Sequence, residues 1–436
     1  MNEFGKQLEE QQQILSGTAE KINYADKMYY NRFTEDLSIY HKLGDVPKLL
    51  GQDEKFLLEC KTKRLKSLGV EAIEEISSIP FSETTGETFS NEKFTFKRCS
   101  KVFKRKITLK SKKGRDYEKK QNIFIDADII FPNPNCIPDD EKINCPYCGE
   151  ISELKKLEKG CEGCGKSSFI TNHFPKTKSF FYRKSNSISV LDIGKIVFIC
   201  CIIGFFLVIP FGVKGFIEDV SVRFTEDTIR NAIANVFIFP FKGVMAGLLV
   251  AVFIIIFKLI YDNIKISALI TKNLECKTKM KKEMQKNGKP FCYENFESKV
   301  IFIIKLIFWC DDREKLVCLN LKNHLREFNI VDSVYRGFMD LKSIYTKNNI
   351  CEISLDIHMS NVYFDGKKFI PKEEIFNIVL QQQMPINNDI GFEFSNVTCP
   401  LCKEHFNAFI NKECNFCGKE YDAKLSEWTV TEFKLK

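Results

Sequence analysis

The order of hydrophobic and polar residues predicts a helical start to the chain. Apolar residues recur there every three or four positions, which places them on one helix face: Ala25, Tyr29, Phe33, Leu37 and Tyr40. Pro47 interrupts this pattern, and "DEKFLLECKTKRLKSLGV" resumes it. We therefore expect a helical N-terminal region over residues 1–80, with the apolar stripe facing a core.

Short alternations replace the helical pattern from Phe81 onward. The stretches "KVFKRKITLKSKKGR" and "NIFIDADIIF" alternate apolar and polar residues, which is typical of strands. Residues 81–144 are therefore predicted to form a small β-rich region. Asp126 and Asp128 are two residues apart and so share one face of a strand. We expect that face to be exposed.

Two apolar stretches predict a transmembrane hairpin. The first helix is expected at residues 193–214 and the second, containing "GVMAGLLVAVFIIIF", at residues 236–261. About 20 apolar residues cross a bilayer, and helices in soluble cores seldom lack a polar face. The residues between them, 215–235, are expected to form a short external loop. Three glycines would let the helices approach closely: Gly204, Gly243 and Gly247.

Lysine and arginine residues near these stretches predict the orientation. "KTKSFFYRK" precedes the first stretch and "KNLECKTKMKKEMQKNGK" follows the second. The positive-inside rule then places both flanks, and hence both termini, in the cytoplasm. The start of the chain is polar and acidic, so no cleavable secretory signal is expected. The predicted location is the cytoplasmic membrane, with the chain integral to it.

The basic segment after the second span, residues 262–289, is predicted to be a cytoplasmic helix at the membrane surface. Its lysines could attract anionic lipid head groups, each by about 1 kcal/mol. The alternative is that they only enforce topology. The candidate membrane-surface residues are Lys272, Lys277, Lys279, Lys281, Lys282, Lys286 and Lys289.

A third pattern begins after Pro290. "FCYENFESKVIFIIKLIFW" predicts an amphipathic or largely buried helix. "RGFMDLKSIYTKN", "ICEISLDIHMSNVYF" and "KKFIPKEEIFNIVLQQQ" predict strands, the last two joined by a turn at Asp365 and Gly366. Helix first and antiparallel strands second indicate an α+β domain over residues 290–396.

Cysteine spacing predicts two metal sites. The 436-residue chain has 18 Cys, a formal net charge of +8 and 44% hydrophobic residues, which excludes wholesale disorder. Eight cysteines form four C-x-x-C pairs, which favours zinc in a reducing compartment over disulfides. Two zinc ribbons are expected, at residues 145–185 and 397–436. Their ligands are Cys145, Cys148, Cys161, Cys164, Cys399, Cys402, Cys414 and Cys417.

Thiolates fill all four positions of each site, so two structural, non-catalytic zinc ions are expected. A glycine follows three of the four turns, where positive φ would let backbone amides point at sulfur: Gly149, Gly165 and Gly418. Lys403 takes that place in the remaining turn. His173 and His405 lie nearby, and we expect neither to be a ligand.

The two cysteine sets belong to an internal repeat. Each follows a strand-rich region, and each precedes an aromatic, basic strand, "SFFYRK" in one case and "EWTVTEFKLK" in the other. We interpret this as two copies of a ribbon module.

The C-terminal part resembles the Tim-forty-four-like domain family. The similarity rests on "FCYENFESKVIFIIKLIFWCDDREKL", "NIVDSVYRGFMDL" and "ICEISLDIHMSNVYFDGKK" in that order, followed by a ribbon with Trp428. It covers about the last 150 residues, a typical single-domain length, and not residues 1–140. The resemblance implies a curved antiparallel sheet backed by helices, like nuclear transport factor two, that binds partners or lipid head groups.

The chain is thus expected to be a multidomain α+β membrane protein. No phosphate-binding glycine loop, paired-His helix or nucleophile elbow is present in the sequence. We expect a non-enzymatic scaffold or adaptor that presents its ribbons and α+β domain to a protein partner or the inner membrane surface. No small-molecule substrate is evident. There are two alternatives. One is a nucleic-acid-binding protein that uses basic stretches such as "KRCSKVFKRKITLKSKKGR". The other is an enzyme that uses the apolar pocket which the resemblance implies on the concave face of the Tim-forty-four-like sheet.

Overall fold

The computed structural model divides the chain into two compact units: residues 1–185 with 272–436, and residues 186–271. We describe each unit by itself. The described residues are 24–48, 50–80, 82–112, 114–133, 141–185, 196–207, 214, 226–285, 291–321, 328–386 and 389–436.

The first half of the first unit has two helices followed by a β-meander. Its elements are α2 (Tyr24–Leu43), α3 (Gln52–Ser67), β1 (Val70–Ser78), β2 (Thr85–Ser90), β3 (Phe94–Ser111), β4 (Tyr117–Pro132) and β7 (Lys176–Lys184). The predicted helical stripe is confirmed in part: Phe33 and Leu37 of α2 are buried, and Tyr29 and Tyr40 are half-buried, but Ala25 is exposed. Tyr30, outside the predicted stripe, is buried as well.

Strand β1 corrects the predicted helical region 1–80. Val70, Ile73 and Ile76 are three apart, which favours a helix. Pairing with β3 overrides this local preference, because every residue of β1 has a partner there, from Val70 with Ser111 to Ser78 with Phe103.

The second half of the unit repeats this plan. Its elements are α8 (Tyr293–Trp309), a short 3₁₀ helix (Arg313–Lys315), β8 (Ile330–Lys347), β9 (Ile350–Phe364), β10 (Phe369–Gln383) and β13 (Thr429–Leu435). The predicted helix and strands of the α+β domain are therefore confirmed. A cysteine ribbon is inserted before the last strand of each half, as the predicted repeat requires.

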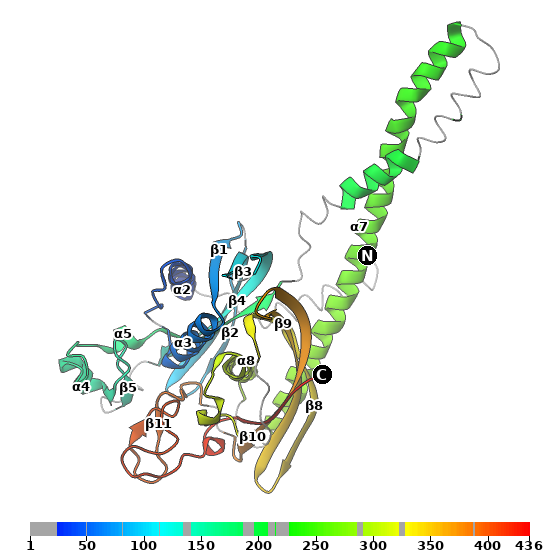
Figure 1. Ribbon diagram of the computed structural model, residues 1–436. Helices are drawn as coiled ribbons and strands as arrows, with labels where there is room; N and C mark the ends of the chain where they lie inside the picture. The colour runs from blue at the N-terminus through cyan, green and yellow to red at the C-terminus, as the bar shows by residue number, and fades with distance from the viewer. Residues whose placement is uncertain are drawn as a thin grey trace. The chain divides into compact units, whose positions relative to one another are not determined.

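All the long strands belong to one nine-stranded sheet, with the order β1-β3-β4-β7-β8-β9-β10-β13 and β2 also on β3 (Figure 1). β8 corresponds to β1 and β2 joined into one strand. A register shift between Tyr335 and Met339 divides β8 in the way that residues 79–84 separate β1 from β2. The order β1-β3-β4-β7 thus matches β8-β9-β10-β13.

The repeat extends to irregularities of the last strands. Lys178 of β7 has no partner residue in β4, because the register of the two strands shifts there. Thr431 of β13 likewise has no partner residue in β10. These bulges occupy the third residue of each strand. The second residue of each, Thr177 or Val430, forms an isolated parallel bridge to a leucine, Leu50 or Leu319. The internal repeat therefore covers whole halves and not the ribbons alone.

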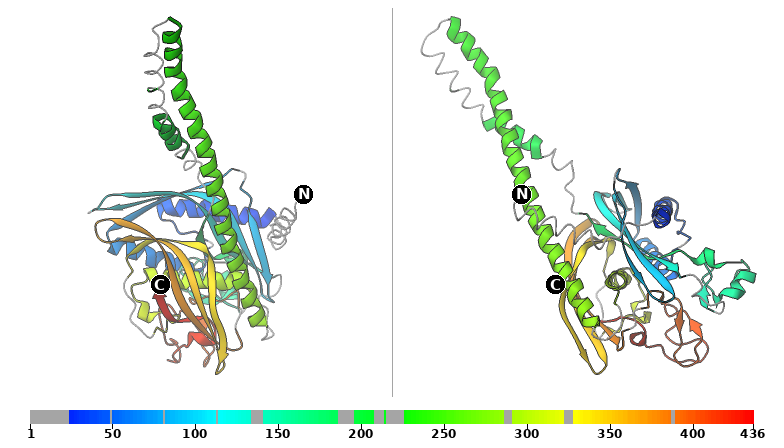
Figure 2. Two further views of the ribbon diagram at one scale, coloured as in Figure 1. Left: turned by 90° about the vertical axis from the view of Figure 1, so that its right-hand side faces the viewer. Right: turned by 180° about the vertical axis from the view of Figure 1, so that it is seen from behind.

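Backbone pairing joins the two halves only weakly. A single parallel residue pair, Arg183 with Tyr335, connects β7 to β8. The main connection is α8, in which 16 of 17 residues are buried. Figure 2 shows α8 within the unit, beside the strands β8–β10. The apolar residues of α8 lie in the larger hydrophobic core of the unit. Residues of α2, β3, β4 and β7 form a second hydrophobic core.

The second unit contains two apolar helical segments. The helix Ile196–Leu207 contacts α7 (Glu226–Gln285), a 60-residue helix that continues into the first unit. A Cβ on Gly204 would lie 2.4 Å from the Gly243 carbonyl oxygen, and one on Gly247 would lie 2.4 Å from that of Cys200. The predicted close approach at these glycines is confirmed.

Only one helix in the described part of the chain is long and apolar enough to cross a membrane, at Phe241–Lys258. The described part of the first predicted span is the shorter helix Ile196–Leu207, so a two-span hairpin is not established. The predicted loop 215–235 is corrected at its end, since α7 begins at Glu226. The second predicted span and the basic segment as far as Gln285 belong to this one continuous helix, and residues 286–289 lie outside the described part of the chain.

Arg105 is a buried ionic link between the halves. Its guanidinium donates to Glu74 Oε1 of β1 at 2.5 Å and to Asp332 of β8 at 2.7 and 3.0 Å. Burial by itself would raise the pKa of both carboxyl groups. Arg105 and the nearby Lys61, joined at Glu74 by His41, together outweigh that effect and hold both pKa values below their usual range.

We predict that Arg105→Met lowers the free energy of unfolding by about 3–5 kcal/mol at pH 7, because two buried carboxylates lose their counter-charge. The unpaired carboxyl groups should then take up protons more readily than in the parent chain. The difference between variant and parent should therefore shrink as the pH falls from 7 to 4. Urea unfolding followed by circular dichroism measures both effects.

The matched control is Lys106→Met, which removes a partly exposed lysine from the next position of β3. Lys106 pairs only with the exposed Glu75 and Glu118, so a loss of about 1 kcal/mol or less is expected. Equal losses in the two variants would contradict the role given to Arg105.

Candidate metal centres and the polar junction

The first cysteine cluster is formed by the segment that follows β4 and precedes β7 in the sequence. It is built by β5 (Lys142–Asn144), β6 (Ile151–Glu153), α4 (Leu154–Lys159) and α5 (Ile170–His173). One pair of cysteines occupies the β5–β6 turn, and the other follows α4. The sulfur atoms of Cys145 and Cys164 are 3.8 Å apart, and those of Cys148 and Cys161 are 3.5 Å apart.

The second cluster lies between β10 and β13. Its first pair occupies the turn between β11 (Val397–Thr398) and β12 (His405–Phe406), and its second pair precedes a 3₁₀ helix (Ala423–Leu425). Cys399 and Cys417 have sulfur atoms 3.6 Å apart, as do Cys402 and Cys414.

Both clusters have the geometry of a tetrahedral metal site. Within each, all four sulfur atoms lie within 4.8 Å of one another. A tetrahedron with metal–sulfur bonds of about 2.3 Å has sulfur atoms about 3.8 Å apart. The eight predicted ligands are therefore brought together as two groups of four, each able to hold one metal ion.

The two cysteine clusters of the described residues include neither His173 nor His405. The Nε2 atom of His173 is 2.9 Å from the hydroxyl of Ser168, and Nδ1 of His405 is 2.8 Å from the Asn396 side-chain oxygen. Both imidazoles thus have hydrogen-bonding partners elsewhere.

The turns position backbone amides around the sulfur atoms. Gly149, Gly165 and Gly418 have φ of 81°, 71° and 69°, as predicted. Lys403 has φ of 63°, so it adopts the same left-handed conformation despite its side chain. The backbone N–H groups of Cys402 and Leu401 lower the pKa of the Cys399 thiol to about 6. This favours the thiolate that a metal requires.

The two ribbons contact each other. Lys142 of the first ribbon pairs with Glu404 of the second at 2.5 Å. The side chain of Asn144 donates to the Ser395 carbonyl oxygen at 3.3 Å, and that of Asn396 donates to the Lys142 carbonyl oxygen at 2.9 Å. The metal sites of the two halves are therefore held in one surface region.

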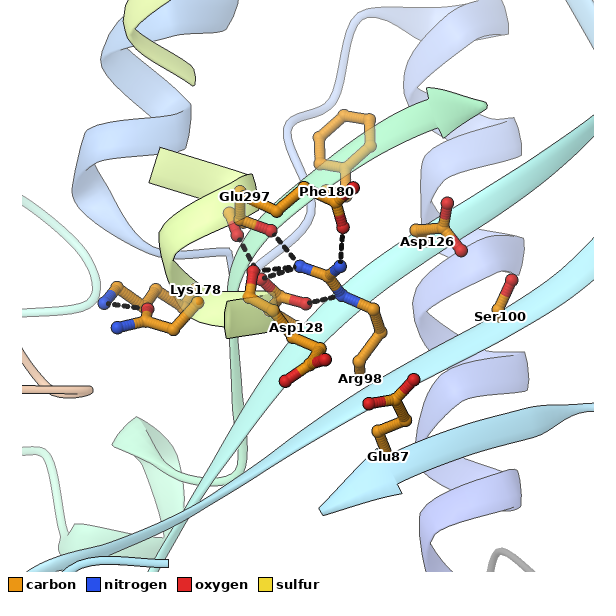
Figure 3. A network of polar contacts seen from close by, with 12 residues as sticks. Glu87, Arg98, Ser100, Asp126, Asp128, Lys178, Phe180 and Glu297 are labelled. Atoms are coloured by element: carbon orange, nitrogen blue, oxygen red, sulfur yellow. Dashed lines mark hydrogen bonds and ion pairs between the residues drawn. The ribbon is translucent and has the colours of Figure 1, made fainter. Parts of the chain in front are cut away.

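A second polar centre links the halves at Arg98 of β3 (Figure 3). Its guanidinium donates to Asp128 Oδ1 at 2.8 Å, to Glu297 Oε2 of α8 at 2.5 Å and to the Ser298 hydroxyl at 2.5 Å. Beside it, Arg183 donates to Asp126 at 2.7 and 3.0 Å. These contacts tie α8 to the first half.

These interactions correct the expectation that Asp126 and Asp128 are exposed. The two carboxylates do share one strand face, but they are 2% and 1% exposed. Burial by itself would raise the pKa of Asp126, whereas Arg183 and Arg98 together hold it below its usual value. Alternation along the strand predicted correctly that the two residues share a face, but it could not reveal that the second half of the unit covers that face.

The predicted membrane-surface lysines differ in exposure and in their ion pairs. Lys272, Lys279 and Lys282 are exposed on α7, and Lys281 is half-buried. Lys277 instead pairs with Glu87 at 2.8 Å and with Glu294 at 2.5 Å. Lys286 and Lys289 lie outside the described residues.

The comparisons with known proteins give no relative. No family model matches the chain, no curated protein matches it, and no solved structure matches it.

The turn at Lys403 provides a test of the metal-site geometry. A left-handed conformation costs a residue other than glycine about 1–2 kcal/mol, and part of this is offset by the flexibility of glycine in the unfolded chain. Lys403→Gly should therefore slow metal loss from the second ribbon to a chelator. Gly418→Ala should accelerate it, although nothing lies within 4 Å of the added Cβ.

Lys403→Ala is the matched control, because it removes the same side chain and keeps the strained conformation. Metal release followed with a chromogenic chelator should leave this variant close to the parent. If Lys403→Ala protected the metal as well as Lys403→Gly, side-chain loss and not backbone strain would explain the gain.

Proposed function

We propose that the protein is a non-enzymatic, membrane-anchored adaptor that uses its paired zinc ribbons to bind a protein partner. The main support is the arrangement of the ribbons, since each half carries a four-thiolate site and the two ribbons contact each other. Such sites keep no open coordination position and so serve structure. No catalytic role is assigned to them.

Zinc is the metal we propose for both sites. Cys145 and Cys399 each begin a set of four cysteines with no carboxylate or imidazole in the group. Four thiolates in a tetrahedron suit zinc. Each ribbon is too small to hold a core of its own, so metal would supply much of its folding free energy.

We predict about two zinc ions per purified chain, as measured by plasma mass spectrometry. Cys148→Ser and Cys402→Ser should each lose one ion, because three ligands remain at the altered site. The control is Cys351→Ser, which changes a buried cysteine outside both clusters and should keep two ions. A folded chain without metal, or with iron in place of zinc, would contradict the assignment.

A membrane anchor is proposed for the second unit. Large apolar side chains of both its helical segments face outward, including Phe198, Phe206, Phe253 and Phe257 with 64–79% exposure. Water would oppose such exposure, whereas lipid tails favour it. We propose two membrane-spanning helices that pack at Gly243 and Gly247, with both termini in the cytoplasm. The exposed lysines of α7 would then serve topology or the inner membrane surface.

The Tim-forty-four-like resemblance is kept as a proposal for the second half. The antiparallel order β8-β9-β10-β13 with the buried helix α8 is the kind of arrangement that the resemblance implies. Because the first half has the same strand order, we propose that it is a second copy of the same domain.

The nucleic-acid alternative loses part of its support. Two cations of the basic stretch that suggested it, Arg98 and Arg105, are buried in ion pairs. Their guanidinium groups are therefore not available to phosphate.

The second ribbon offers the more apolar surface to a partner. Leu401 and Phe416 occupy its two cysteine turns and are 67% and 65% exposed, and Ile410 lies between them at 69%. In the first ribbon the corresponding turns carry Tyr147, at 51%, and Gly163. Exposed apolar residues at such density are typical of protein-binding sites.

Affinity capture from detergent-solubilised membranes, followed by mass spectrometry, tests this function. The full chain and a Tyr147→Ser control should retain the same specific partner. The double variant Leu401→Ser, Phe416→Ser should lose it while it keeps two zinc ions. Capture unaffected by the double variant would contradict the proposed surface.

A further inference from the structure

A pocket opens where the two halves meet beside β7. Its volume is about 440 Å³, counting the part that is open to solvent. The first half contributes Asp53, Lys178 and Ser179. The second half supplies polar residues from α8 and apolar walls that include Phe302, Ile303, Phe392 and Phe394. A mostly apolar pocket with a few polar groups is typical of a small-molecule site.

Lys178 reaches this pocket because of the bulge in β7. Three successive residues, Thr177, Lys178 and Ser179, are all buried, since the bulge interrupts the alternation of the strand. The Lys178 ammonium donates to the Asn295 side-chain oxygen at 3.1 Å and to the Ile390 carbonyl oxygen at 2.9 Å. Figure 3 shows its side chain pointing away from the Arg98 network.

The charge of Lys178 has no direct counter-ion. Both of its acceptors are neutral oxygens, and no carboxylate of the described residues lies within 4.0 Å. The Lys178 side chain is only 8% exposed. Glu427, Asp389 and Glu393 act on Lys178 only from a greater distance. A buried charge is best stabilised by a directly hydrogen-bonded opposite charge, so the site has room for an anion beside the ammonium.

The other charged groups of the pocket are already compensated. Glu427 pairs with Lys299 and accepts from the Trp428 backbone N–H. The two oxygens of Asp53 accept the backbone N–H groups of Phe394 and Ser395, at 2.8 and 2.9 Å. The Asn295 side-chain nitrogen donates to no acceptor among the described residues. Lys178 and Asn295 therefore offer free N–H groups to a ligand.

We propose that this pocket binds a small organic carboxylate that carries an apolar or aromatic group. The carboxylate accepts hydrogen bonds from Lys178 and Asn295 and supplies the missing counter-charge. The apolar group packs against Phe302 and Phe394. Because the lining comes from both halves, the ligand also stabilises their association.

The protonation of Lys178 agrees with this assignment. Burial lowers the pKa of Lys178 to about 8, so the amine is mostly protonated at pH 7. A carboxylate binds the protonated form. Affinity should therefore fall towards tenfold per pH unit above the pKa of Lys178. It should rise as the pH falls through 6, because burial and the neighbouring Glu393 raise the pKa of the pocket residue Asp53 to about 6 and its negative charge is then lost.

Isothermal titration calorimetry of the full zinc-loaded chain in detergent tests the proposal with phenylacetate and its neutral analogue phenylacetamide. We expect phenylacetate to bind and phenylacetamide to bind at least about tenfold more weakly, since the neutral amide leaves the buried ammonium without a direct counter-charge. Lys178→Met should weaken phenylacetate binding at least as much.

Two further variants test whether phenylacetate binds at Lys178. Lys101→Met changes a lysine of β3 outside the pocket and should bind phenylacetate like the parent chain. Asn295→Asp places a carboxylate beside Lys178, so it should abolish phenylacetate binding and stabilise the fold. Absence of phenylacetate binding, equal binding of the amide, or unchanged binding by either pocket variant would overturn the proposal.

Discussion

The structure of the first unit depends on the burial of the polar residues of α8. This helix has 16 of its 17 residues buried, and five of those are polar: Glu294, Asn295, Glu297, Ser298 and Lys305. Buried charges and amides are tolerated only with partners. Those partners come largely from the first half, where Arg98 binds Glu297 and Lys178 binds Asn295. The halves therefore need each other, although their strands share only one residue pair.

Duplication explains how such a contact can coexist with two similar folds. Each half builds its own meander, carries its own ribbon and closes with a bulged last strand. The bulged residue differs between the two copies: it is Lys178 in β7 and Thr431 in β13. A feature of the repeated fold thus places a buried ammonium at the junction in one copy only.

Local signals in the sequence were enough to predict much of this architecture. Cysteine spacing gave both clusters, because a C-x-x-C turn holds two sulfurs together by itself. Apolar periodicity gave α2, α3 and α8, and alternation gave β3, β4, β9 and β10. Features that depend on distant partners were missed: the strand β1, the burial of Asp126 and Asp128, and the pairing of Lys277 with Glu294. Nothing near those residues in the sequence identifies what covers them.

We conclude that the two halves form one cooperative unit held by the buried polar contacts of α8. Native-state hydrogen exchange on the full chain, at increasing denaturant, measures it most directly. Amides of β3 and β4 in the first half and of β9 and β10 in the second should then exchange with one common free energy of opening. Two separate values, with one half opening while the other stays protected, would contradict it.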